Sequence, residues 1–237
     1  MSGARRAAGP GPGPTSSDEV VVWYFRTDEA DTDVDGLVAV LDDEERGRAD
    51  AMRHPTDRRD FVVAHGVSRL ILGRQLDLPP AGVRWRPDRS GRPELTGTGG
   101  RVQVSLSHSD RLAALALTGY RRVGVDVQRL ATGDPTGLAA RFFPAAEAGL
   151  VAGQSRADRR SAVFTRLWAR KEACVKVTGS PLVEGLALPV RGRAGALVGH
   201  PAGPVAVRDV PAPDGFRAAV ALNGASRFRV TSRRWCG

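Results

Sequence analysis

Three short apolar segments follow one another between residues 101 and 128, and they restrict the fold more than any other feature of the sequence. These segments read RVQVSLS, RLAALAL and RVGVDVQ, with the turn-forming stretches SHSD and TGY between them. Short apolar or β-branched runs separated by such turns predict three successive β-strands. Helix-like segments lie before and after them, so the sequence predicts a fold of the α+β class.

The part before these strands begins with a lead that is rich in Gly, Pro and Ser, and we expect residues 1–18 to be disordered. A strand is expected at VVVWYF (20–25), and a helix from about Asp33. A second helix is expected over DRRDFVVAHGVSRLILGRQLDL (57–78), where apolar residues recur at helical spacing.

The part after these strands repeats the pattern. A short helix is expected after Pro144, and a longer one over Asp158–Thr178, ended by Gly179. Four further strands are expected at ALPVRGR, PVAVRDV, FRAAVAL and RFRVTSRRW. We therefore predict two α+β halves, residues 19–122 and 123–237.

Composition limits the possible classes of protein. The sequence has no run of about 18 apolar residues and no signal-peptide pattern, and its two cysteines form no disulfide framework, so we expect a cytoplasmic protein. The net charge of +9 implies an anionic partner, such as nucleic acid, a phosphorylated small molecule or an acidic protein. Aromatic residues make up only 5% and do not alternate with a basic run, which argues against nucleic acid.

The strand VGVDVQ presents a carboxylate on its polar face. Alternation places its three valines on one face and Gly124, Asp126 and Gln128 on the other. Because the valines would be buried, we expect Asp126 to have a functional role, with Gly124 leaving room for a close approach.

The stretch FTRLWARKEACVKVTG (164–179) holds the only two lysines among 35 basic residues. As a helix, it places Glu172 and Lys176 one turn apart, with Lys171 about 100° around from Glu172. A solvated surface pair is one interpretation. However, most of the helix circumference is apolar, so we expect the charged strip to face a cavity or a partner.

The stretch SLSHSD (105–110) offers hydroxyl, imidazole and backbone donors at a strand end, as phosphate binding requires, although a structural role is equally open. Two carboxylates, two ammonium groups and this turn together predict Mg²⁺-dependent chemistry on a phosphate or pyrophosphate ester. The residue chemistry alone does not name the substrate.

The order and spacing of these motifs resemble a known family. VGVDVQ, followed about 40 residues later by LWARKEACVKVTG, is similar to the paired signature of 4′-phosphopantetheinyl transferases, in particular the larger surfactin-synthetase-activating type. SLSHS, SGRPEL and RFFPAAEAGLV match further motifs of this family. EERGRADAM and DRRDFVVAHGVSRLILGRQL resemble its basic N-terminal helices.

The resemblance implies two similar subdomains related by a pseudo-twofold axis, with coenzyme A in the cleft between them. It implies transfer of the phosphopantetheine arm to a serine of an acidic acyl or peptidyl carrier protein, with release of adenosine 3′,5′-bisphosphate. The larger type tends to serve secondary metabolism. Because one chain supplies both halves of the site, we expect a monomer.

The resemblance also assigns residues. Asp126 and Glu172 match the Mg²⁺ ligands, and Glu172 is in addition the candidate base for the serine. Many members carry an acidic third ligand where this chain has Gln128, an amide that supplies an oxygen but no charge. The implied coenzyme contacts are Lys176 and Lys171 at the pyrophosphate, with Ser107, His108, Arg48 and Arg92.

Two other functions are also compatible with parts of the sequence. A basic nucleic-acid-binding protein without enzymatic activity would account for the charge but not for the motifs. A different Mg²⁺-dependent phosphotransferase is less favoured, because the sequence has neither a P-loop nor a kinase glycine loop.

Overall fold

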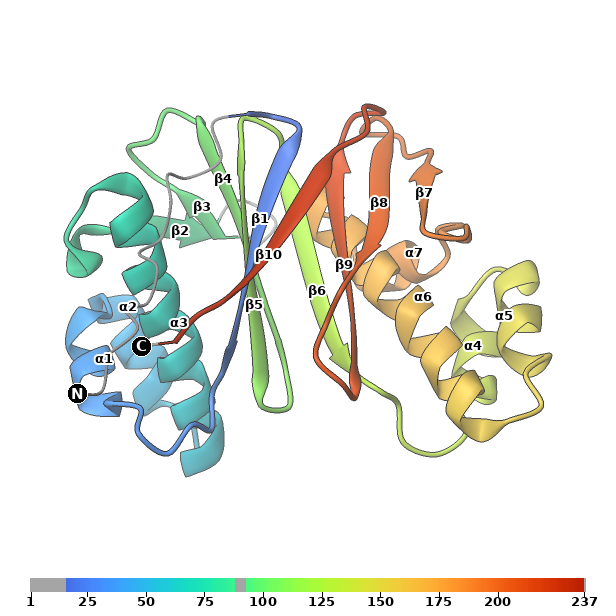
Figure 1. Cartoon of the computed structure of the whole chain (residues 1–237), viewed down its shortest axis with the longest axis horizontal. Helices are drawn as coiled ribbons and strands as arrows, with labels where there is room; N and C mark the ends of the chain where they lie inside the picture. The colour runs from blue at the N-terminus through green and yellow to red at the C-terminus, as the bar shows by residue number, and fades with distance from the viewer. Residues whose placement is uncertain (1–15, 88–92, 237) are drawn as a thin grey trace, which may run out of the picture.

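The structure is a computed structural model that describes residues 16–87 and 93–236, and it is an α+β protein as the sequence predicted (Figure 1). The helices are α1 (Val34–Val40), α2 (Asp43–Asp50), α3 (Pro55–Leu76), η1 (Pro80–Gly82), α4 (Thr136–Phe142), α5 (Ala145–Ala152), α6 (Ala157–Thr178) and α7 (Leu182–Leu186). The strands are β1 (Glu19–Arg26), β2 (Trp85–Pro87), β3 (Pro93–Leu95), β4 (Val102–Ser109), β5 (Leu112–Gly119), β6 (Val123–Arg129), β7 (Gly195–Val198), β8 (Val205–Val210), β9 (Phe216–Asn223) and β10 (Arg229–Arg234).

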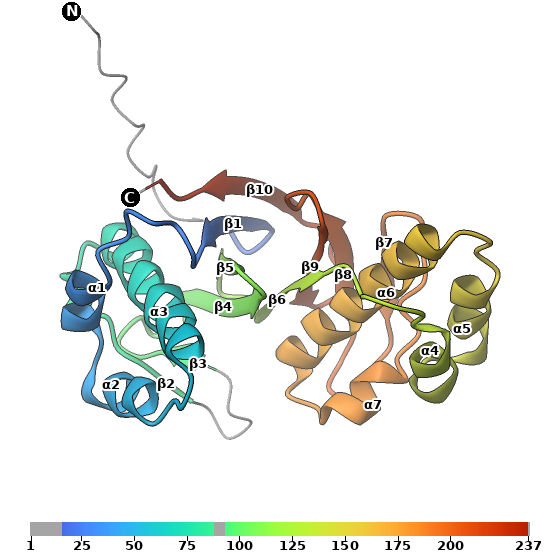
Figure 2. The ribbon, with the colours of Figure 1, turned by 90° about the horizontal axis from the view of Figure 1, so that it is seen from below.

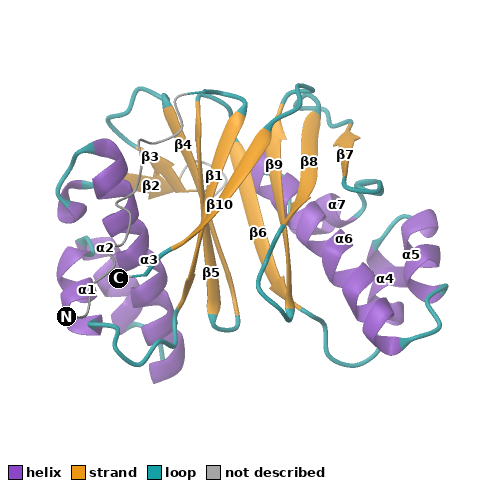
Figure 3. Cartoon of the chain, in the orientation of Figure 1, coloured by secondary structure: helices purple, strands orange, loops and turns teal. Residues whose placement is uncertain are grey.

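Two four-stranded sheets lie in the middle of the molecule, with helices on both outer sides (Figure 3). Their strand orders are β10-β1-β5-β4 and β6-β9-β8-β7. Three apolar cores hold these layers together: one between α3 and the first sheet, one between the sheets, and one between α6 and the second sheet. A strand in the middle of the first sheet is therefore covered on both faces, which explains why β5 is buried along its whole length, whereas the edge strand β10 is not.

The long helices begin and end where local chemistry favours it. Asp42 caps α2 in a capping box with Glu45, so the expected single helix breaks after α1 and restarts at Asp43. Helix α6 ends at Gly179, which has the left-handed conformation (φ 71°) that glycine adopts without steric cost.

The edge strands β4 and β6 of the two sheets lie side by side (Figure 2). Serine side chains of β4 join the sheets there. Hydroxyl oxygens of Ser105, Ser107 and Ser109 accept hydrogen bonds from the backbone N–H groups of residues 125, 127 and 129, at 3.1, 3.3 and 3.1 Å. The free edge of β6 is therefore satisfied by side chains in place of a neighbouring strand. We call this contact the serine seam.

The C-terminal strand departs from the predicted division of the chain. β10, which the sequence analysis placed in the half 123–237, pairs in parallel with β1 of the first sheet. Trp235 follows it into the N-terminal core, where its ring lies 6.2 Å from that of Trp23, edge to face. The prediction was wrong here because strand order depends on partners that are distant in sequence.

Smaller elements also differ from the predictions. No strand forms at ALPVRGR in the described part of the chain; β7 begins at Gly195 instead, and the sequence analysis missed α4 and α7. Of the lead predicted to be disordered, only residues 16–18 are described, and Asp18 forms an ion pair with Arg121 at 2.7 Å. Within the described residues, no helix combines the length and the apolar character that crossing a bilayer requires.

The serine seam gives a testable prediction. Ser105→Ala leaves the buried N–H of Val125 without an acceptor, so we expect the free energy of unfolding to fall by about 1–3 kcal/mol. Ser109→Ala is the matched control, because the N–H of Arg129 lies in an exposed position where water replaces the hydroxyl. Urea unfolding of both variants measures this difference. If both lost the same free energy of unfolding, the buried hydrogen bond of Ser105 would not be the stabilising part of the serine seam.

Candidate active site

Asp126 lies at the serine seam and is almost completely buried, with an exposure of 1%. Its Oδ1 accepts hydrogen bonds from Ser107 Oγ and Lys176 Nζ, each at 2.8 Å. Its Oδ2 is buried and has no hydrogen-bond partner among the described residues. A buried carboxylate oxygen without a partner is costly unless a ligand or ion completes its shell.

Helix α6 supplies the groups that face this aspartate. Lys176 Nζ also donates to the carbonyl oxygen of Val125 at 2.9 Å, so the ammonium group is fixed against β6. Gly124 makes this approach possible, because a Cβ there would lie 2.1 Å from the carbonyl oxygen of Ala173. Helix α6 therefore fills the space beside Gly124. The group that approaches this glycine closely is the backbone of α6.

Glu172 is half-buried and lies near enough to Asp126 to feel its charge. Burial, and then the negative charge of Asp126, raises the pKa of Glu172, while Lys176 and the indole of Trp168 act in the opposite direction. Two carboxylates that repel each other are a site that a cation would stabilise. The structure thus brings Asp126, Glu172 and Lys176 together.

The donor set fits a divalent cation, although the described residues contain no cluster of three or more His, Cys, Asp and Glu side chains suited to a metal. The unpartnered Oδ2 of Asp126 and the neighbouring carboxylate of Glu172 are hard oxygen donors, which Mg²⁺ prefers. Mg²⁺ commonly takes one or two protein carboxylates and completes its shell with water and phosphate.

The predicted third ligand, Gln128, has another partner in this structure. Its Oε1 accepts a hydrogen bond from Ser109 Oγ at 3.3 Å, so the amide takes part in the serine seam. Gln128 lies on the same face of β6 as Asp126, two residues further along the strand.

The serine and histidine of the predicted phosphate-binding turn have different environments. Ser107 is buried and contacts Asp126 directly. His108 is exposed at the end of β4; partial withdrawal of its ring from water, and then the charges of His65 and Lys176, lower its pKa. Both residues lie in the strand β4 and not in a turn after it.

The two predicted arginine contacts come from the N-terminal half. Arg48 is exposed at the end of α2, and its guanidinium group lies 5.0 Å from the centre of the Phe61 ring. Arg92 lies outside the described residues.

The prediction that Lys171 faces the pyrophosphate is wrong. Its side chain is completely buried, and its Nζ lies 2.6 Å from Glu147 Oε2 of α5 and 4.7 Å from the centre of the Phe143 ring. Burial lowers the pKa of Lys171, and the Glu147 carboxylate partly offsets this. Lys171 therefore ties α5 to α6 inside the C-terminal core, away from the strip that Glu172 and Lys176 occupy.

Several residues of this region escaped the sequence analysis. Arg170 is buried and forms a bidentate ion pair with Asp209 of β8 at 2.6 and 2.7 Å, which holds α6 against the second sheet. Nothing local in the sequence indicated this pair. The serine seam did leave a signal, since serines at 105, 107 and 109 repeat with the period of a strand.

Comparison with known proteins identifies the family that the sequence motifs indicate. A sequence profile described as the 4′-phosphopantetheinyl transferase superfamily matches residues 122–194, which span β6 to α7. The 4′-phosphopantetheinyl transferase HetI of a Nostoc species is 35% identical over 175 residues, covering 71% of this chain and 72% of the relative. The enzymes psf-1 of Bacillus pumilus and Sfp of Bacillus subtilis are 29% and 24% identical, covering 60% and 65% of each chain.

These matches define the chain as a group-transferring enzyme. It belongs to the 4′-phosphopantetheinyl transferase superfamily, as its sequence motifs predicted.

The buried position of Lys171 gives a second prediction. Lys171→Met leaves Glu147 charged and unpaired in the core, so we expect a loss of about 3–5 kcal/mol in the free energy of unfolding. Adding Glu147→Gln to it should recover part of this loss, as urea unfolding of the single and double variants would show.

Arg156→Met is the matched control, because Arg156 forms its ion pair with Asp158 in solvent, where little change is expected. If Lys171→Met weakened only coenzyme A binding and left stability unchanged, the buried pair would not be the role of this lysine.

Proposed function

We propose that this enzyme transfers the 4′-phosphopantetheine arm of coenzyme A to a serine hydroxyl of an acyl or peptidyl carrier protein and releases adenosine 3′,5′-bisphosphate. The observation that carries the proposal is the buried Asp126 with an unpartnered oxygen beside Glu172 and Lys176. The relatives named 4′-phosphopantetheinyl transferases support the same reaction class. The net charge of +9 suits both an anionic coenzyme and an acidic carrier.

Asp126 and Glu172 are the residues that would hold Mg²⁺. The ion, when bound, would neutralise charge on the diphosphate oxygens. Gln128 is a weaker candidate for a direct ligand, because its amide oxygen already accepts a hydrogen bond from Ser109.

Glu172 is the proposed proton acceptor of the carrier serine. As the serine oxygen forms its bond to the phosphorus that carries the pantetheine arm, the bond from that phosphorus to the bridging oxygen breaks, and the hydroxyl proton passes to Glu172. The raised pKa of Glu172 suits this task, because a carboxylate that holds its proton more firmly is a better base near neutral pH.

Lys176 is the proposed diphosphate contact within the C-terminal half. Its ammonium group is already oriented by Asp126 and by the carbonyl oxygen of Val125, so little side-chain freedom remains to be lost when an anion binds. Ser107, His108, Arg48 and Arg92 stay as proposed coenzyme contacts. The narrower assignment to the surfactin-synthetase-activating type also belongs to this proposal.

The direct test is to incubate the protein with apo carrier proteins, coenzyme A and Mg²⁺, and to weigh the carriers. We expect a mass gain of one phosphopantetheine arm with the wild type. Glu172→Gln should lower the rate by at least about a hundredfold, the usual contribution of a general base. The matched control is Glu184→Gln on α7, an exposed glutamate that should transfer at the wild-type rate.

No mass gain on any of several carriers would contradict the proposed function. A Glu172→Gln variant as fast as the wild type would remove only this residue from the chemistry.

The site also predicts a change in metal binding. Gln128→Glu adds a third carboxylate beside Asp126, so we expect Mg²⁺ or Mn²⁺ to bind about tenfold more tightly, since ligand charge tunes the affinity of such sites. Calorimetric titration of the metal into protein with and without coenzyme A measures this. Gln154→Glu, beyond the end of α5, adds the same charge elsewhere and should leave the affinity unchanged; equal gains in both variants would indicate a general charge effect.

A further inference from the structure

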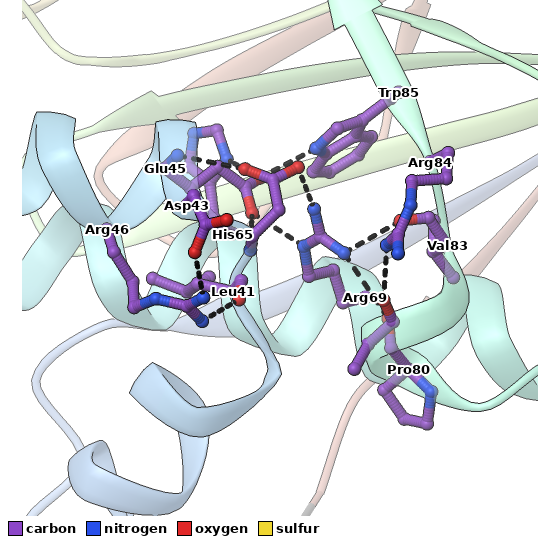
Figure 4. Close-up of polar contacts among 12 residues, drawn as sticks. Leu41, Asp43, Glu45, Arg46, His65, Arg69, Pro80, Val83, Arg84 and Trp85 are labelled. Carbon is purple, nitrogen blue, oxygen red and sulfur yellow. Dashed lines mark hydrogen bonds and ion pairs between the residues drawn. The ribbon is translucent and has the colours of Figure 1, made fainter.

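The N-terminal half also contains a buried carboxylate, at Glu45 of α2 (Figure 4). Its exposure is 4%, and it accepts hydrogen bonds from side chains on two other elements. His65 Nδ1 lies 2.8 Å and Trp85 Nε1 2.6 Å from Oε1, and Arg69 Nε donates to Oε2 at 2.6 Å. Glu45 therefore ties together α2, α3 and the strand β2.

Glu45 is ionised in the folded protein. Burial alone would raise its pKa, but the hydrogen bonds and charges of His65, Arg69 and Trp85 bring it down to about 2. An ionised carboxylate only accepts hydrogen bonds, so Nδ1 of His65 must carry a proton, and Nε2 can donate to a phosphate oxygen when the ring carries a second proton there. This fixes the orientation of the imidazole and leaves Nε2 as its outward-facing nitrogen.

The Nε2 atom of His65 has no polar partner among residues 16–87 and 93–236, and the side chain is 17% exposed. Two aromatic rings hold the imidazole in place: Phe61 stacks on it with 4.0 Å between ring centres, and Trp85 meets it edge to face at 5.6 Å. Three contacts thus restrain one partly buried ring, which is more than a surface histidine needs.

The same ring lies among groups already assigned to the coenzyme. Phe61, which stacks on His65, also carries the guanidinium group of Arg48 at 5.0 Å. The charge of His65 also lowers the pKa of His108, as that of Lys176 does, so both groups lie within electrostatic reach of His108. His65 therefore shares the Phe61 ring with Arg48 and lies within electrostatic reach of His108, two of the proposed coenzyme contacts in the N-terminal half.

We propose that His65 is a further coenzyme-binding residue, which presents Nε2 to the phosphate-bearing nucleotide end, and that Glu45 is the positioning residue that holds it. This inference rests on the proposed function, because it assumes that coenzyme A binds between Arg48 and His108. It adds a contact from the middle of α3, and it gives the buried Glu45 cluster a role in binding as well as in folding.

Two substitutions separate the two nitrogens. In His65→Asn the amide nitrogen takes about the place of Nδ1, which keeps the hydrogen bond to Glu45 and removes Nε2. In His65→Gln the amide takes about the place of Nε2, which keeps the outward group and loses the bond to Glu45. The measurements are calorimetric binding of adenosine 3′,5′-bisphosphate, without any carrier protein, and the midpoint of urea unfolding.

We expect His65→Asn to bind the bisphosphate about tenfold more weakly, the effect of one lost hydrogen bond to a charged group, with nearly wild-type stability. His65→Gln should bind within about threefold of the wild type and unfold at lower urea. His65→Asn should therefore be the weaker binder and His65→Gln the less stable variant. A role of His65 in folding alone would instead make the less stable variant also the weaker binder.

If His65→Asn binds the bisphosphate as tightly as the wild type, the Glu45 cluster is only structural and the inference is wrong, while the proposed function stands. If the wild type itself binds neither the bisphosphate nor coenzyme A, the proposed function fails and this inference fails with it.

Discussion

The position of the site depends on the serine seam between β4 and β6. Each sheet has its own helix layer and core, and these two strands are the edges at which the sheets meet. Hydroxyl groups of β4 take the place of a neighbouring strand along β6, and one of them, from Ser107, bonds at the same time to Asp126. One of the contacts that join the halves thus also orients the carboxylate.

Local sequence patterns predicted much of this arrangement, because strand alternation and helix periodicity are local properties. These patterns predicted β4, β5, β6 and α6. They also predicted that Asp126, Glu172 and Lys176 lie on polar faces. They did not predict the order of strands in the sheets. β10 pairs with β1 across about two hundred residues of chain, and no local signal specifies this pairing.

Lys171 shows a second limit of periodicity. A helical wheel gives the angle of a side chain around the axis but not what lies opposite to it. At 100° from Glu172, Lys171 was equally compatible with a polar strip and with the core, and its partner Glu147 lies on a different helix. The same holds for Glu45, whose partners come from α3 and β2 and form a buried cluster that no single segment reveals.

The crossing of β10 has a consequence for any attempt to divide the molecule. A fragment that stops at the junction after residue 122 would lack the strand that covers β1, and its sheet would present an open backbone edge of the kind that recruits other chains. It would also lack Trp235, which packs against Trp23. Residues 229–235 therefore belong, in energetic terms, to the first sheet and its core, and removing them would destabilise the amino-terminal half.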